Sequence, residues 1–213
     1  TRVTGSRLRV QPLRSKRHLH GRQIEALSLV GMPGSGKSTV GRHLAKHLGL
    51  QFFDSDTEIE QRIGMPIRDW FQQHGEDSFR DVEQDVIDEL TSRPDVVLAT
   101  GGGAVLRPSN RDALHSRTHV IYLKSGPEEL FRRLRHDTQR PLLQVADPLQ
   151  KLRDLFKERD PLYRRAAHFI VEAARPSVPA LMDMVMMQLE LAGLVGGQDQ
   201  ADTSGPSTQP HRP

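Results

Sequence analysis

Short apolar runs alternate along this chain with segments in which apolar residues recur every three or four positions. The runs are typical of buried strands, and they cover residues 24–30, 51–54, 96–100, 120–123 and 169–171. Strands that alternate with amphipathic helices are the pattern of a parallel sheet with helices on both faces. The pattern therefore predicts an α/β domain.

Seven helical segments carry an apolar stripe with a period of about 3.6 residues. Their inward positions are Val40, Leu44 and Leu48; Ile59 and Ile63; Ile67, Trp70 and Phe71; Phe79, Val82, Val86 and Leu90; Leu130, Phe131 and Leu134; Leu149, Leu152, Leu155 and Phe156; and Val178, Leu181, Val185 and Leu189. Gly49 should end the first segment, and Pro127 should open the fifth. The sequence Ser55-Asp56-Thr57-Glu58 resembles a capping box and should start the second segment. Gly75 separates the third from the fourth.

Three stretches depart from this pattern. Residues 137–148 break both periods, contain two prolines, and are predicted to form a mobile loop over the site. Residues 1–23 hold seven Lys or Arg and no Asp or Glu, and residues 194–213 are rich in Gly, Gln, Ser and Pro. Both ends are expected to be disordered, although the first could instead be an organelle transit peptide or an arm that contacts nucleic acid. The folded domain is expected to span residues 24–193.

The net charge of +3 belongs to one end of the chain. Residues 24–213 carry 23 basic and 27 acidic side chains, a balance of −4. A general nucleic-acid-binding surface is therefore not implied, and we expect no nucleic-acid partner. No apolar run approaches the length of a membrane span. The chain has no cysteine, which excludes disulfides and thiolate metal sites and fits a cytoplasmic enzyme. We expect it to be a monomer that does not bind membranes.

The most informative motif is Gly-Met-Pro-Gly-Ser-Gly-Lys-Ser at residues 31–38, between an apolar run and a helical segment. It matches G-x-x-x-x-G-K-[ST], the phosphate-binding loop, in which Lys37 would reach phosphate oxygens and Ser38 would ligate Mg²⁺. The glycines let backbone N–H groups surround the β- and γ-phosphates, and a helix that starts at Gly36 would direct its positive end at the same anion. Nucleotide contacts are expected from Gly34, Ser35, Gly36, Lys37, Ser38 and Thr39.

Two carboxylates, Asp54 and Asp56, stand at the end of the second predicted strand. In an open parallel sheet the carboxyl ends of the strands face the ligand crevice. One carboxylate could hold the water shell of Mg²⁺, and the other could orient or deprotonate a hydroxyl that accepts a phosphoryl group. Alternatively, Asp56 or Ser55 caps the following helix, and capping and catalysis could coexist.

Gly101-Gly102-Gly103 follows the third predicted strand. Three consecutive glycines either let a ligand approach the backbone closely or form a plain strand-to-loop turn. Arg80 stands early in a helical segment, on its inner face, where a guanidinium fork suits a carboxylate. Arg140 lies in the predicted loop, and Arg159 precedes Asp160. Any one of these arginines could also be a solvated surface charge.

Six motifs occur in an order and at a spacing that are specific as a set. They are Gly-Met-Pro-Gly-Ser-Gly-Lys-Ser-Thr-Val-Gly-Arg, Phe-Asp-Ser-Asp-Thr-Glu-Ile-Glu, Gly-Glu-Asp-Ser-Phe-Arg-Asp-Val-Glu, Ala-Thr-Gly-Gly-Gly-Ala-Val, Arg-Pro-Leu-Leu and Arg-Asp-Pro-Leu-Tyr. The set resembles that of the shikimate kinases, over residues 24–193. The resemblance implies a three-layer P-loop fold of the nucleoside-monophosphate-kinase type with a five-stranded parallel sheet. It also implies transfer of the γ-phosphoryl group of ATP to the 3-hydroxyl of shikimate, with Mg²⁺ as cofactor.

Position by position, the resemblance implies a catalytic set of Lys37, Asp56 and Arg140. Asp56 would hold the shikimate hydroxyls and act as the base, and Asp54 would lie near Mg²⁺. The other implied contacts are Arg80 and Arg159 with the shikimate carboxylate, Gly101, Gly102 and Gly103 with the substrate through the backbone, Arg133 with the adenine ring, and Arg140 with the transferring phosphate.

Two other functions are considered. A kinase of the same fold that acts on gluconate or on a nucleoside monophosphate would share the phosphate-binding loop, but it should not need Asp-Ser-Asp, Phe-Arg and Gly-Gly-Gly together. A kinase-like ligand-sensing domain of a transcription regulator could dispense with Lys37, Asp56 or Arg140. All three residues are present, which favours an active enzyme.

Overall fold

The structure is a computed structural model, and it describes residues 24–135, 144–173 and 177–196 of the chain. The basic segment 1–23 and residues 197–213 of the expected tail lie outside the described residues. So do residues 136–143, which include residues 137–143 of the expected loop and Arg140.

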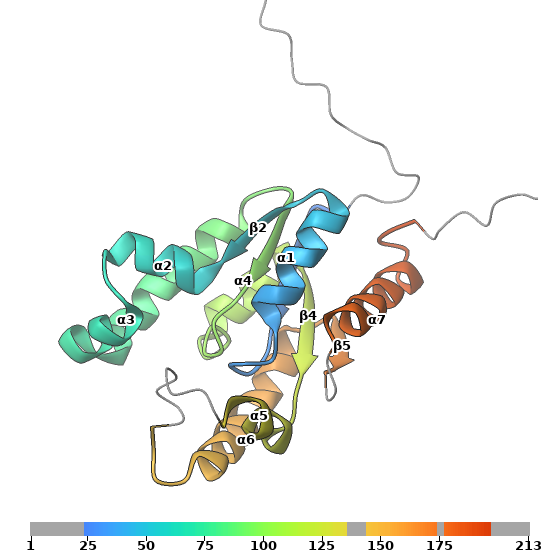
Figure 1. Cartoon of the computed structure of the whole chain (residues 1–213). Helices are drawn as coiled ribbons and strands as arrows, with labels where there is room; N and C mark the ends of the chain where they lie inside the picture. Colours follow the sequence, from blue (N-terminus) through green and yellow to red (C-terminus); the bar gives the residue numbers. More distant parts are fainter. Residues whose placement is uncertain (1–23, 136–143, 174–176, 197–213) are drawn as a thin grey trace, which may run out of the picture.

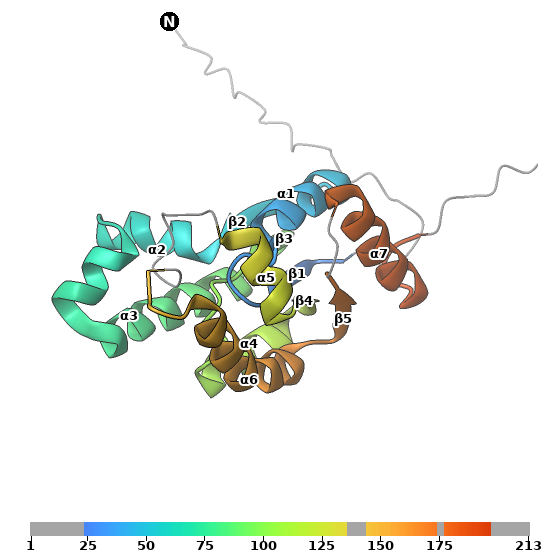
Figure 2. The same cartoon turned by 60° about the horizontal axis from the view of Figure 1, so that its bottom comes forward.

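Five parallel strands form one sheet (Figure 1), and Figure 2 labels all of them in the order β2-β3-β1-β4-β5. They are β1 (Ala26–Val30), β2 (Gln51–Asp54), β3 (Val96–Ala99), β4 (His119–Lys124) and β5 (Phe169–Glu172). Ser28 of the central strand pairs with Leu98 on β3 and with Val120 on β4. The five apolar runs are therefore the five strands, with ends that differ by no more than two residues from the prediction.

Helices cover both faces of the sheet. They are α1 (Lys37–Leu48), α2 (Ser55–Ile63), α3 (Ile67–Thr91), α4 (Pro108–Arg117), α5 (Pro127–Leu134), α6 (Pro148–Ala166) and α7 (Val178–Leu191). α1 and α7 pack on one face, around Leu29 and Leu123. α3, α4 and α6 pack on the other, around Val30 and Tyr122 (Figure 2). Neighbouring residues of β1 thus face opposite cores, as expected for a parallel sheet that is buried on both sides. The predicted three-layer fold is confirmed.

The start of α2 differs from the expected capping box. The N-cap is Asp54, whose Oδ1 accepts hydrogen bonds from the N–H groups of Asp56 at 2.9 Å and Thr57 at 3.3 Å. Ser55 does not cap the helix, because its hydroxyl accepts from the N–H of Gly101 at 3.0 Å. A carboxylate at the N-cap satisfies two of the N–H groups that every helix leaves unpaired in its first turn. The helix therefore begins at Ser55, one residue earlier than a cap at Ser55 would place it.

Other helix boundaries also differ from the sequence pattern. α3 covers both helices predicted around Gly75, and it is interrupted there by the non-helical angles φ 81° and ψ 175°. α4 was not predicted, because it has no apolar period: its buried residues are Leu114 and the polar Asn110. The Nδ2 of Asn110 donates to Ala104 O at 3.0 Å. α6 begins at Pro148, within the expected loop.

The packed part of the chain continues beyond residue 193. Leu194 and Val195 are partly buried against the core between the sheet and α1 and α7, and the N–H of Leu194 donates to Leu189 O at 3.0 Å. These two residues therefore do not belong to a disordered tail. Among the helices of the described residues, none has both the length and the apolar character needed to cross a membrane.

Three histidines meet at the amino-terminal edge of β4 and β5. The Nδ1 of His168 accepts from the N–H of Val120 at 2.9 Å, and its ring stacks on that of His115 with 4.0 Å between centroids. The ring of His119 meets it edge-on. Partial burial and the two neighbouring histidines lower the pKa of His168. Because a protonated Nδ1 cannot accept a hydrogen bond, the fold requires His168 to be neutral.

We therefore expect acid to remove a contribution of His168 to stability. Its pKa in the folded protein lies below the unfolded value of about 6.5, so the contribution is complete above that pH and is lost as the pH falls. His168→Asn should supply a comparable acceptor that does not titrate. Between about pH 7.5 and about pH 5.5, the unfolding midpoint of the native protein should fall roughly 2–4 °C further than that of the variant, the size expected of one hydrogen bond. Equal falls would contradict the expectation.

Candidate active site

The phosphate-binding loop (residues 31–38) connects the carboxyl end of β1 to the start of α1. Gly36 is the N-cap of α1 and has φ 94°, a left-handed angle that other residues rarely adopt. A Cβ at this position would meet no atom within 4 Å, so the backbone angle and not the available space requires glycine. The first N–H groups of α1 are left to face the loop, which is the arrangement that binds phosphate at a helix N-terminus.

Lys37 lies across this loop with only 7% of its surface exposed. Its Nζ donates to Gly31 O at 2.8 Å and to Met32 O at 2.9 Å, and it lies 3.5 Å from Ser35 Oγ. The ammonium group is therefore held beside the N–H groups that would bind an anion.

Ser38 and Asp54 place two oxygen atoms next to the loop. Ser38 Oγ donates to Asp54 Oδ2 at 2.5 Å, while Asp54 Oδ1 caps α2. Hard oxygen donors of this kind suit Mg²⁺, which takes one or two protein ligands and completes its shell with phosphates and water. In the described part of the chain, no group of three or more His, Asp or Glu could hold a metal ion. A cation at Ser38 and Asp54 would thus depend on the nucleotide as well.

Asp56 lies in the first turn of α2 and faces the glycine turn (residues 101–103). A Cβ on Gly101 would lie 2.5 Å from Asp56 Oδ1, so only glycine lets the carboxylate come this close. Burial raises the pKa of Asp56 to about 6, the negative charges of Asp54 and Glu83 add to the rise, and Lys37 opposes it. A carboxylate with this pKa is a stronger proton acceptor than an ordinary aspartate and is still mostly ionised at neutral pH.

Two arginines approach the other glycines of the turn. A Cβ on Gly102 would lie 3.3 Å from Arg159 Nη1, and a Cβ on Gly103 would overlap the Arg80 guanidinium. The turn therefore brings together Asp56 of α2, Arg80 of α3 and Arg159 of α6. We call these three side chains and the glycine turn the acceptor cluster.

Arg80 is held in place by Glu83, a residue that was not predicted from the sequence. Arg80 Nη1 donates to Glu83 Oε1 at 2.7 Å, and Nη2 lies 3.5 Å from Glu76 Oε1. Glu83 is 1% exposed, and burial raises its pKa while Arg80 opposes the rise. The sequence spacing could have predicted this ion pair, because a glutamate three positions after an arginine on the inner face of a helix is placed to pair with it.

Arg133 of α5 lies under the phosphate-binding loop. Its Nη1 donates to Gly34 O at 3.2 Å, and its Nη2 donates to Ser125 Oγ at 2.9 Å and to Ala173 O at 3.2 Å. Partial burial lowers the pKa of its guanidinium. Arg133 thus holds the loop through Gly34. Its contact with adenine stays a prediction, and so does the role of Arg140.

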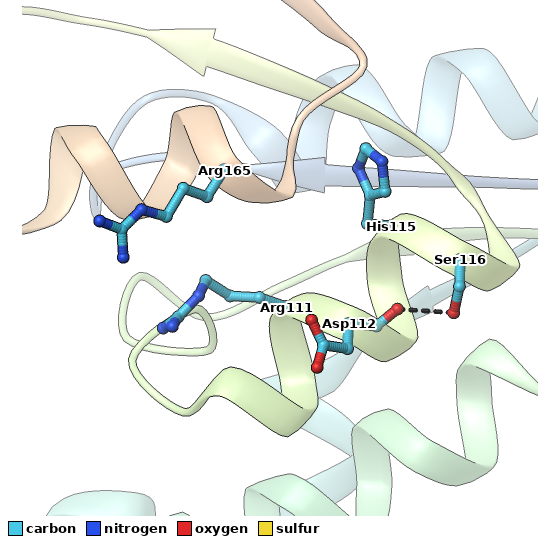
Figure 3. A pocket seen from close by; sticks show the side chains of 5 residues that line it. All are labelled: Arg111, Asp112, His115, Ser116 and Arg165. Carbon is cyan, nitrogen blue, oxygen red and sulfur yellow. Dashed lines mark hydrogen bonds between the residues drawn. The ribbon is translucent and has the colours of Figure 1, made fainter.

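A surface hollow of about 450 Å³ lies elsewhere on the molecule (Figure 3). It is lined by Arg111, Asp112, His115, Ser116 and Arg165, which belong to α4 and the end of α6. α6 ends just before the start of β5, at the amino-terminal edge of the sheet. Ligands of open α/β sheets bind at the opposite edge, so this hollow has no part in the site.

The fold, the loop and the acceptor cluster define an ATP-dependent P-loop kinase of a small molecule. The family model of shikimate kinase matches residues 33–190. A shikimate kinase of Paracidovorax citrulli is 58% identical over 179 residues, which cover 83% of this chain and 97% of that protein. One from Burkholderia thailandensis is 55% identical over 172 residues, which cover 81% and 94%. This chain belongs to the shikimate kinase family.

Solved structures agree with this assignment. Shikimate kinase from Acinetobacter baumannii in complex with shikimate has a TM-score of 0.74 and 48% identity, over 79% of this chain and 94% of that one. A gluconokinase from Sinorhizobium meliloti 1021 has a TM-score of 0.51 at 19% identity. The second likeness shows a common fold alone.

Proposed function

We propose that this chain transfers the γ-phosphoryl group of ATP to the 3-hydroxyl of shikimate, giving ADP and shikimate 3-phosphate. The observation that supports this most is the convergence of Asp56, Arg80 and Arg159 on the glycine turn. Shikimate carries several hydroxyls and one carboxylate. The cluster offers a carboxylate acceptor for the hydroxyls and two guanidinium forks for the carboxylate.

In this proposal, Arg80 and Arg159 bind the carboxylate of shikimate. Arg80 Nε is buried without a partner among the described residues, as is Arg159 Nε, so each guanidinium keeps a donor for an anion. Glu83 holds one end of the Arg80 guanidinium and fixes its plane. The glycine turn brings the backbone close to the substrate, where a side chain would collide with the cluster.

Asp56 acts on the hydroxyl that accepts the phosphoryl group. It takes the proton of the 3-hydroxyl while the hydroxyl oxygen bonds to the γ-phosphorus and the bond to the β–γ bridging oxygen breaks. The electron pair of that bond leaves with ADP. Lys37 and the N–H groups of the loop stabilise the negative charge on the phosphates.

The remaining nucleotide contacts complete the proposal. Ser38 and Asp54 would hold Mg²⁺, which neutralises phosphate charge when bound. Arg140 would reach the transferring phosphate, and Arg133 would lie near the adenine ring. The Arg140 contact is supported by the family motif Arg-Pro-Leu-Leu, in which it stands, and the Arg133 contact by the hydrogen bond of Arg133 to Gly34 O of the loop.

Release of ADP, measured by a coupled assay with different acceptors, tests the function. Shikimate should support turnover, while gluconate and nucleoside monophosphates should not. Faster turnover with gluconate would assign the cluster to another acceptor. Binding of shikimate without any release of ADP would indicate a ligand-sensing domain.

Arg80→Lys should weaken shikimate binding although it keeps the positive charge. Lysine cannot pair with Glu83 and present a fork to a carboxylate at the same time. Loss of one charged hydrogen bond should raise the KM for shikimate by about 10- to 100-fold. The KM for ATP should change far less. Equal changes in the two KM values would mean that Arg80 supports the fold and not the acceptor.

A further inference from the structure

Tyr163 lies behind the glycine turn, one helical turn after Arg159 on α6. Its side chain is 0% exposed, and its hydroxyl donates to Gly102 O at 2.6 Å. Burial raises the pKa of Tyr163 to about 12, and the charge of Arg159 and a hydrogen bond to it oppose the rise. The hydroxyl therefore stays protonated at neutral pH and remains a donor to Gly102.

Gly102 is the point at which three segments meet. A Cβ on Gly102 would lie 2.7 Å from Pro33 of the phosphate-binding loop and 3.3 Å from Arg159 Nη1 of α6. The carbonyl of Gly102 and the N–H of Gly103 belong to one planar trans peptide unit, so the two groups point in opposite directions. Because Tyr163 binds the carbonyl, the N–H of Gly103 faces away from Tyr163.

The glycine turn carries two backbone donors that have no acceptor within the described part of the chain. The N–H of Gly101 is taken by Ser55 Oγ, and the N–H of Ala104 donates to Gly101 O at 3.1 Å. Across residues 24–135, 144–173 and 177–196, the N–H groups of Gly102 and Gly103 find no acceptor. Gly103 is buried, and a buried N–H without a partner is costly. An acceptor oxygen on a ligand would remove that cost.

We propose that Tyr163 is a positioning residue of the acceptor site. Its hydroxyl orients the Gly102–Gly103 peptide so that the N–H of Gly103 faces an oxygen of shikimate, and it keeps this peptide in register with Arg159. Tyr163 itself does not touch the substrate. The inference rests on the proposed function, since it takes shikimate as the acceptor.

Tyr122 offers a matched control for this role. It is also 0% exposed, and its ring centroid lies 5.0 Å from that of Tyr163. Its hydroxyl donates to Asp160 Oδ1 at 2.8 Å, and among the described residues it forms no hydrogen bond with the glycine turn. Phenylalanine at either position keeps the ring and removes the hydroxyl, which at Tyr122 bonds to Asp160 and at Tyr163 bonds to Gly102 O and Arg159.

Steady-state kinetics of the two variants show whether Tyr163 positions the Gly102–Gly103 peptide or only stabilises the core, as Tyr122 does. Tyr163→Phe should raise the KM for shikimate about fivefold, the effect of one neutral hydrogen bond, and leave the KM for ATP within about twofold. Both variants should lower the unfolding midpoint, because each loses buried hydrogen bonding. Tyr122→Phe, however, should leave both KM values within about twofold of those of the native enzyme. Equal effects of the two variants on the KM for shikimate would overturn the inference.

A double-mutant cycle with Arg159→Lys asks whether Tyr163 acts through the acceptor cluster. Because both residues would position the same peptide and carboxylate site, their effects on the KM for shikimate should be less than multiplicative. Fully independent effects would contradict the shared role.

A measurement on the native protein covers the case in which Tyr163→Phe does not fold. The amide resonance of Gly103 should shift when shikimate is added, and that of Gly101, already bonded to Ser55, should shift less. If the native protein does not phosphorylate shikimate, the proposed function fails and this inference fails with it. An active native enzyme in which Gly103 does not respond to shikimate overturns the inference alone.

Discussion

Lys37→Ala should reduce turnover by roughly 10²- to 10³-fold or more, the loss found when one preorganised donor to a developing charge is removed. In the structure the Lys37 ammonium lies beside the N–H groups of the phosphate-binding loop, held by the carbonyls of Gly31 and Met32. It would stabilise the charge of the transferring phosphate. Activity in the ADP-release assay measures the effect.

The variant must be folded for this result to count. Lys46→Ala is a suitable control, because Lys46 lies on the same helix and is exposed. It should leave turnover unchanged. Lys37→Ala should keep the circular-dichroism spectrum of the native protein. If a folded Lys37→Ala protein retained near-normal turnover, the assignment of the loop to ATP would be wrong.

Asp56→Asn should lower turnover by roughly 10²- to 10⁴-fold, the range of a positioned base. Asparagine keeps the size of the side chain and loses both the charge and the capacity to accept a proton. Binding of ATP, measured by calorimetry, should be largely retained. A loss of less than about tenfold would mean that Asp56 does not act as the base.

The same substitution should stabilise the protein without ligands. The pKa of Asp56 rises from its usual 3.8 to about 6, so the ionised form is disfavoured by the fold. The stability that depends on protonation is complete below the usual pKa and is lost as the pH rises through about 6. At neutral pH, Asp56→Asn should therefore gain about 1–3 kcal/mol in the free energy of unfolding.

That gain should disappear near pH 4, where Asp56 is protonated in the native protein. Asp183→Asn provides the control, since Asp183 is exposed on α7 and should change stability little at either pH. Thermal unfolding at the two pH values measures the difference. A gain in stability together with a loss of turnover is the pattern of a residue kept for chemistry at the expense of stability. A variant less stable than the native protein at neutral pH would contradict the burial argument.

The strands, most helices and the phosphate-binding loop could be predicted from the sequence, because each depends on a local period or on a motif with its own geometry. α4 could not be, since the polar Asn110 fills one of its two buried positions and interrupts the apolar period. The N-cap of α2 was predicted at Ser55 or Asp56, whereas the structure has it at Asp54. Asp54, Ser55 and Asp56 are all good N-cap residues, and the contact of Ser55 with Gly101 decides among them.

The residues proposed to contact the acceptor were easier to predict than those proposed to position them. Asp56, Arg80 and Arg159 stand in recognisable motifs, and the structure brings all three to the glycine turn. Glu83 and Tyr163 stand in two of the same motifs, but no role was predicted for them, because a glutamate in a helix and a tyrosine near a proline are ordinary in a sequence. Their roles exist only through contacts with Arg80 and Gly102, which depend on how α3 and α6 pack.

The two carboxylate oxygens of Asp54 bond to two different parts of the candidate site. Oδ2 accepts from the hydroxyl of Ser38 on the phosphate-binding loop, while Oδ1 caps the turn of α2 that carries Asp56. A cation that drew Oδ2 toward itself would therefore pull on the helix that holds the base. If both substrates bind as proposed, binding of the nucleotide and alignment of the acceptor would be coupled through this one carboxylate, and thermodynamic linkage would require the coupling to act in both directions.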